Sequence, residues 1–212
     1  EAKTIVAQGG GTMSTFKINA FDYEDNQHYY LGHYFVDNYN KALENYPLIN
    51  SRINITRMEV WVLDQGGASI ETQKPIVGIR DLGDQTGVTP NNANNNLYNQ
   101  ISSTLGASRD VTAAYNLLNG RSFPNSQGAL EQYSPTEHYI TNVKARKLNT
   151  SEYKFNTQLG YMSLNQRLND NQFLAVSYSY TINGSTTVYK VGEFSEENPV
   201  LITKLLKSNI TV

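Results

Sequence analysis

The chain has 212 residues, of which 39% are hydrophobic and 17% are charged, and its formal net charge is −2. This length and hydrophobic content suit one globular domain of generous size or two small ones. No cysteine is present, which excludes disulfide frameworks, thiolate metal sites and thiol catalysis. Nucleic-acid-binding proteins normally carry an excess of basic residues. This chain shows no such excess, so we expect no nucleic-acid partner.

Three further features bear on where the chain acts. It begins at Glu1 without a signal peptide, which suggests a fragment of a longer protein. No apolar run approaches the roughly 20 residues of a membrane-spanning helix. The 15 tyrosines and abundant asparagines indicate a polar, aromatic surface, as on many secreted and outer-membrane β proteins.

The first predicted elements are a strand and a long amphipathic helix. Residues 13–20 alternate between apolar and polar side chains, which predicts a half-buried strand. Over residues 27–45 the apolar side chains recur at helical spacing, and Pro47 follows as a stop. The surplus aromatic side chains of this helix, Tyr29 and Tyr30 among them, suit either a core face or an interface with another molecule.

Two strands are predicted next, at residues 53–63 and 75–82, and they could pair as neighbours in a sheet. The first strand carries the only tryptophan of the chain and has one apolar face and one mixed face. The apolar face holds Met58, Val60 and Val62, and the mixed face holds Ile55, Arg57, Glu59 and Trp61. Such a mixed face is typical of a surface covered by another element of the same protein, or of a docking surface.

The middle third of the chain reads as a helical insertion. A loop rich in asparagine precedes two short predicted helices at residues 97–106 and 108–120. Ser108 is the expected N-cap of the second helix, and Asn119-Gly120 is its expected stop. A further loop then leads back to β structure.

The last third is β-rich. It contains a long strand at 137–148, one or two short strands within 153–168 broken at Gly160, and a final strand or short helix at 200–208. The clearest hairpin spans residues 173–194, with Asn183-Gly184 suited to a tight primed turn. Its alternation also fits two membrane-barrel strands, but the charges on Lys190 and Glu193 favour a soluble sheet.

The predicted fold class is therefore α+β: a largely antiparallel β-sheet with one long amphipathic helix and a helical insertion. We expect one module over residues 1–212, with a β/α part at 12–82, the helical or loop insertion at 83–136 and a β-rich part at 137–212.

The sequence lacks the common catalytic and phosphate-binding motifs. It has no phosphate-binding loop and no GxSxG nucleophile motif. His28 and His33 are five residues apart, which is the wrong offset for two ligands on one helix face. We therefore expect no catalytic residue, no cofactor and no resident metal. Two alternatives stay open, namely a carboxylate pair assembled from distant segments and an adventitious calcium ion at the acidic stretches 22–25 or 81–84.

Four strings resemble one family of secretion proteins. They are NITRMEVWV at 54–62, PIVGIRDLG at 75–83, LGYMSLNQRLNDNQFLAVSYSYTINGSTTVYKVGEF at 159–194 and LITKLLKS at 201–208. In this order they resemble the soluble N-terminal-type module of the SprA family, also called Sov. The insertion at 83–136 carries no such string.

The resemblance implies a parent that is a very large transmembrane β-barrel, the outer-membrane translocon of type IX secretion and gliding motility in Bacteroidetes. The implied partners are the remainder of the translocon barrel, secretion-system subunits and cargo proteins, with membrane contact only through the parent barrel. No catalytic residue carries over, so we expect a non-enzymatic domain at the pore mouth or in contact with cargo. Long insertions in such barrels are usually extracellular, which favours the cell surface and leaves the periplasm as the alternative.

The residues expected to form an interaction surface are Tyr29, Tyr30, Arg57, Glu59 and Trp61. The same aromatic side chains also suit a free-standing carbohydrate-binding or cell-surface adhesion module, and this second function class stays open.

Overall fold

The computed structural model of the chain describes residues 24–63, 73–85, 89–106, 109–118, 122–124, 130–135 and 137–208. Strands predominate over helices, and most paired strands run antiparallel, so the predicted α+β class is confirmed. The strand predicted at 13–20 lies outside the described residues.

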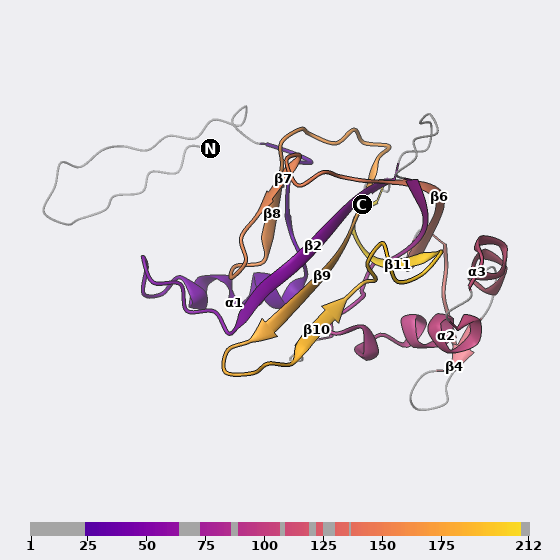
Figure 1. The fold of residues 1–212 in the computed structure, drawn as a ribbon, viewed down its shortest axis with the longest axis horizontal. Coiled ribbons are helices and arrows are strands. Elements are labelled where there is room, and N and C mark those ends of the chain that lie inside the picture. Colours follow the sequence, from indigo (N-terminus) through magenta and orange to yellow (C-terminus); the bar gives the residue numbers. More distant parts are fainter. Residues whose placement is uncertain are drawn as a thin grey trace, which may run out of the picture.

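Five strands pair in a ring, which we call the closed sheet. Around the ring they are β2 (Ile53–Leu63), β9 (Phe173–Ile182), β11 (Leu201–Lys207), β3 (Gln73–Ile79) and β6 (Tyr139–Lys147), which returns to β2. Figure 1 labels β2, β6, β9 and β11. The β11–β3 pair is parallel and the other four pairs are antiparallel. Closure gives each of these strands a partner on both sides, which removes the exposed edges of an open sheet. A further strand, β10 (Val188–Val191), pairs with β9 beside the ring.

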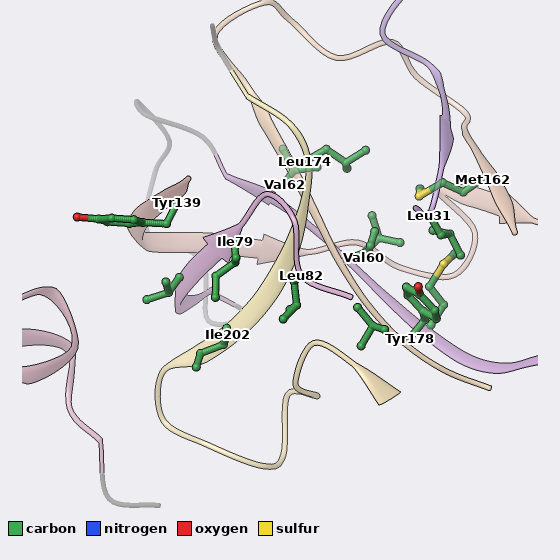
Figure 2. Packing of buried hydrophobic residues seen from close by; sticks show 14 of the residues in the cluster. Leu31, Val60, Val62, Ile79, Leu82, Tyr139, Met162, Leu174, Tyr178 and Ile202 are labelled. Carbon is green, nitrogen blue, oxygen red and sulfur yellow. The ribbon is translucent and has the colours of Figure 1, made fainter. Parts of the chain in front are cut away.

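The two faces of the closed sheet bury separate hydrophobic clusters. The smaller cluster takes side chains from all five strands, and its members are Trp61, Ile76, Ile140, Ala145, Phe173, Ala175, Leu201 and Leu205. The larger cluster also includes residues of helices and of other strands, which cannot fit within a ring of five strands. The smaller cluster therefore fills the ring, and the larger one covers its outside. Figure 2 shows the outer cluster, with Val60, Leu174 and Ile202 contributed by three strands of the ring.

A helix and a small sheet cover part of the outer face. The helix is α1 (His33–Ala42), and the sheet consists of β1 (His28–Tyr30), β8 (Tyr161–Leu164) and β7 (Tyr153–Phe155). Phe35 of α1 and Met162 of β8 belong to the outer cluster. The predicted break at Gly160 is confirmed, because this glycine has φ 62° and separates β7 from β8.

The predicted helix at 27–45 is shorter than expected, because its first residues form β1. His28 pairs with Ser163 and Tyr30 with Tyr161, so tertiary pairing with β8 outweighs the helical spacing of the side chains. The helix begins where the backbone N–H of His33 donates to Asp84 Oδ1 at 3.0 Å. Asp84 is itself held by Lys204 of β11, whose Nζ lies 2.5 Å from Oδ2. The N-terminus of α1 is thus determined by two residues far away in the sequence.

The pairing expected between the strands at 53–63 and 75–82 is wrong. The first is confirmed as β2, but β6 lies between β2 and β3 in the ring. The assignment of Ile55 to the mixed face is also wrong. The register shifts between Ile55 and Arg57, and such a bulge inserts one residue and reverses the alternation. Ile55 consequently joins Met58 in the outer cluster.

The predicted insertion contains η2 (Asn92–Asn94), α2 (Asn96–Leu105), α3 (Val111–Leu118) and the two-stranded sheet β4 (Ser122–Pro124) with β5 (Leu130–Gln132). Asp110 caps α3, since its Oδ1 accepts the N–H of Ala113 at 2.8 Å. The expected cap at Ser108 and the stop at Asn119-Gly120 lie outside the described residues. Leu97 and Ile101 of α2 and Ala114 of α3 join the outer cluster, so both helices pack on the closed sheet.

The hairpin predicted at 173–194 is confirmed as β9 and β10. Its turn differs from the primed type, because Gly184 has φ 81° whereas Asn183 is not among the positive-φ residues. The N–H of Ser185 donates to Ile182 O at 2.9 Å, which together with the glycine indicates a type II turn. The segment at 200–208 is the strand β11 rather than a helix.

Candidate interaction surface

The mixed face of β2 points into one end of the closed sheet, where Glu59 is the centre of a polar cluster. Glu59 is only 3% exposed. Its carboxylate accepts from Lys147 Nζ at 2.5 Å, from the backbone N–H of Ser195 at 2.9 Å and from Arg57 at 2.8 Å. Burial alone would raise the pKa of Glu59, but these hydrogen bonds outweigh it and leave the pKa below its usual value. Glu59 therefore stays ionised and holds β2, β6 and the segment after β10 together.

Arg57 extends this cluster to the surface. Its side chain is 43% exposed, and its two terminal nitrogens bind both carboxylate oxygens of Glu196, at 2.5 and 2.8 Å. The guanidinium also lies 4.0 Å from the ring centroid of Phe194, in a cation–π arrangement. Arg57 is thus held in a defined position while part of its side chain remains open to a partner.

Glu196 provides a direct test of this arrangement. The Arg57 guanidinium lowers the pKa of the Glu196 carboxyl from 4.5 to about 2. A lowered pKa means that the pair stabilises the fold above pH 4.5 and that this contribution is lost as the pH falls towards 2. Glu196 is exposed, so solvent screening keeps the contribution below about 1 kcal/mol.

We expect NMR titration of the Glu196 carboxyl to give a pKa below 4.5, and to give a higher value in Arg57→Gln than in the unchanged protein. Lys190→Gln is the matched control, because Lys190 binds the neighbouring carboxylate of Glu197 at 2.6 Å. A Glu196 pKa that is the same in Arg57→Gln and in the unchanged protein would contradict the arrangement.

Trp61 lies deeper in the ring than Arg57 and Glu59 and is 1% exposed. Lys147, its neighbour across the strand pair, has its ammonium 5.9 Å from the indole centroid. The structure therefore places Trp61 in the interior of the closed sheet, with no broad ring face open to a flat partner surface.

Tyr29 and Tyr30 lie elsewhere, on β1 of the three-stranded sheet. Tyr30 is 40% exposed and contacts the ring of Tyr39 edge-on, with centroids 5.6 Å apart. Tyr29 packs against the outer cluster, and burial together with the charge of Asp25 raises its pKa to about 12. The five predicted residues thus occupy two sheets, and Arg57 and Tyr30 are the ones with substantial exposed surface.

The sequence contains no signal for the partners of two buried glutamates, Glu59 and Glu193. Lys147 and Ser195 bind Glu59 from distant parts of the chain, and nothing local marks either of them. Arg109 and Glu193 form a second, fully buried ion pair that joins the insertion to the closed sheet. Strand alternation places Glu193 near a predicted strand end, but its partner in a loop 84 residues away has no sequence signal.

Two features of the described residues bear on function. No group of three or more His, Asp or Glu side chains within these residues is arranged to hold a metal ion. None of the helices in the described part of the chain combines the length and apolar character that crossing a membrane requires.

Comparison with known proteins gives one family. No curated protein matches the chain. The sequence profile of the SprA_N family, described as a motility related/secretion protein, matches residues 1–113. The match covers more than half of the chain and includes β2, β3, α2 and the start of α3, so it reaches into the insertion where no resembling string was found. The chain therefore belongs to the SprA_N family of motility- and secretion-related proteins.

Proposed function

We propose that the chain is a non-enzymatic domain of a SprA-like outer-membrane translocon, and that it serves type IX secretion and gliding motility. The observation that carries the proposal is the family match, which associates the chain with motility and secretion. The domain would shape the pore mouth or contact cargo and partner subunits. Residues 1–212 would act as one module, which is supported by the packing of α2 and α3 into the cluster that covers the closed sheet.

The surface of the described chain offers groups that suit protein contacts. Large hydrophobic side chains are exposed at Tyr46 (77%) and Leu48 (70%), after α1, in addition to Tyr30. Arg57 is held in place by Glu196 and Glu59. Aromatic side chains and arginine are enriched in protein interfaces, so these groups support a structural or partner-binding domain.

The proposed location is the extracellular side of the outer membrane, with the periplasm as the alternative. An epitope tag in the exposed β9–β10 turn, next to Gly184, tests this in the full-length protein in its own cells. Antibody labelling of intact cells is the expected result. Labelling only after outer-membrane permeabilisation would assign the periplasmic side. A tagged protein that fractionates with the cytoplasm would contradict the proposal.

A functional test uses the two exposed residues of the candidate surface. We expect Tyr30→Ala combined with Arg57→Ala in the full-length protein to lower the amount of secreted cargo and to reduce colony spreading, at unchanged translocon abundance. Val188→Ala, at a side chain that is 62% exposed on β10, is the control. Equal secretion by both variants would exclude this surface from partner contact.

A further inference from the structure

A cavity of about 500 Å³ opens at the end of the closed sheet where β2 and β6 finish and β3 begins. Its lining includes Trp61, Lys74, Lys147, Asn149, Thr150 and Ser195. Cavities that bind small molecules or chain ends have about this size. Trp61 and Leu148 provide apolar wall, and the remaining lining is polar, so the cavity can hold a group with one charged end and one apolar side.

Counted over the described residues, the charges around the cavity leave one positive charge in excess. Lys147 is paired with Glu59, and Arg57 is paired with Glu196. Lys74 makes no ion pair with any described residue, and its ammonium donates only to the backbone carbonyl oxygens of Ser195 and Asn198. A half-buried ammonium with no carboxylate partner favours an anion beside it.

Among the described residues that line this cavity, the charged side chains are the two lysines, Lys74 and Lys147, and none is an aspartate or a glutamate. The amide and hydroxyl side chains of the lining can donate as well as accept hydrogen bonds. Trp61 lies in the cavity wall, and its indole N–H is buried, with no hydrogen-bond partner within the described chain. This N–H therefore reports on occupancy of the cavity without contacting the ligand itself. A ligand with acceptor oxygens and a single negative charge matches both the donors and the charge excess.

We infer that this cavity is a binding site for a carboxylate, either the terminal carboxylate of a peptide or an acidic side chain. The carboxylate lies against Lys74 and Lys147, and the adjoining apolar group packs on Leu148 and on the small part of Trp61 that the cavity exposes. The two negative charges of a phosphate dianion would exceed the one unpaired positive charge beside the cavity. The site is independent of the role in secretion and would remain if that proposal failed.

Trp61 makes the site directly observable, because it is the only tryptophan of the chain. The whole chain, labelled with ¹⁵N, gives one indole N–H signal. We would titrate it at constant ionic strength with three probes: N-acetyl-Gly-Ala as the free acid, N-acetyl-Gly-Ala-amide, and N-acetyl-Gly-Glu-amide. Saturable shifts are expected with at least one carboxylate probe and none with the probe that lacks a carboxylate. The free acid and the glutamate probe distinguish the two sources of the carboxylate.

Lys74→Gln removes the charge and keeps a hydrogen-bond donor at the end of a side chain that is one bond shorter. It should weaken binding of the preferred probe about tenfold or more, the loss expected for a charge-assisted hydrogen bond. Lys190→Gln, which removes a lysine bound to Glu197, should leave binding unchanged. Four results would each overturn the inference. They are equal shifts with the amide probe, no saturable shift with any probe, tighter binding of inorganic phosphate, and full binding by a folded Lys74→Gln variant.

Discussion

Arg109→Met should lower the free energy of unfolding by about 3–5 kcal/mol, because it leaves the carboxylate of Glu193 buried without its partner. The two side chains are 5% and 2% exposed, and the guanidinium binds both carboxylate oxygens, at 2.8 and 2.9 Å. Glu193 also accepts from the backbone N–H of Ile202 at 2.9 Å, so the pair connects the α2–α3 loop to β11. Urea denaturation followed by far-UV circular dichroism measures the loss.

Arg146→Met is the matched control. Arg146 forms an ion pair of the same chemistry with Glu152, at 3.0 Å, but both side chains are 35% exposed. Such a pair contributes less than about 1 kcal/mol. The double variant Arg109→Met with Glu193→Leu should recover most of the loss, because replacing both charges removes the uncompensated one. An Arg109→Met variant as stable as Arg146→Met would show that the insertion is not docked through this pair.

Gly160→Ala should lower the free energy of unfolding by about 2–5 kcal/mol. The glycine has φ 62°, a conformation that costs other residues about 1–2 kcal/mol. A β-carbon at this position also overlaps the ring of Phe35, which belongs to the outer cluster, and overpacking of this kind typically costs about 1–3 kcal/mol. Thermal and urea unfolding of the variant measure the sum.

Gly106 shows a backbone cost without an overlap. Its φ is 62° and its ψ is −160°, and nothing lies within 4 Å of a β-carbon built on it. Gly106→Ala should therefore show a backbone cost alone, about 1–3 kcal/mol, for a conformation that almost only glycine adopts. In a Phe35→Leu background, Gly160→Ala should cost less than in the unchanged protein, because the smaller side chain relieves the overlap. Equal costs for Gly160→Ala in the Phe35→Leu background and in the unchanged protein would place the Phe35 ring away from Gly160.

Much of the local structure could be predicted from the sequence. The bounds of β2 agree with the predicted strand at 53–63, and the β9–β10 hairpin lies within the predicted 173–194. These strands are long and strongly alternating, so the side-chain pattern alone specifies them. The family could also be predicted, since the resembling strings at 54–62 and 75–83 fall within the matched residues 1–113.

The candidate site was predicted only in part. Alternation correctly grouped Glu59 and Trp61 on one face, but it could not show that this face points into a closed sheet. It also misplaced Ile55, because a bulge is set by the pairing with β9 and leaves little trace in the composition of β2. Lys74 and Ser195 had no signal at all, since each becomes a neighbour of the site only through the order of strands.

The α+β class, the main strands and hairpin, and the family follow from the sequence, because each depends on side-chain patterns within a short stretch of chain. Three other features emerge from the folded chain alone: the closure of the ring with β6 between β2 and β3, the contact of Asp84 with the start of α1, and the buried pairs of Glu59 and Glu193. These features join residues that are far apart in the chain. Their partners are selected by packing and by the cost of leaving a buried charge unpaired, and neither quantity can be read from a local pattern.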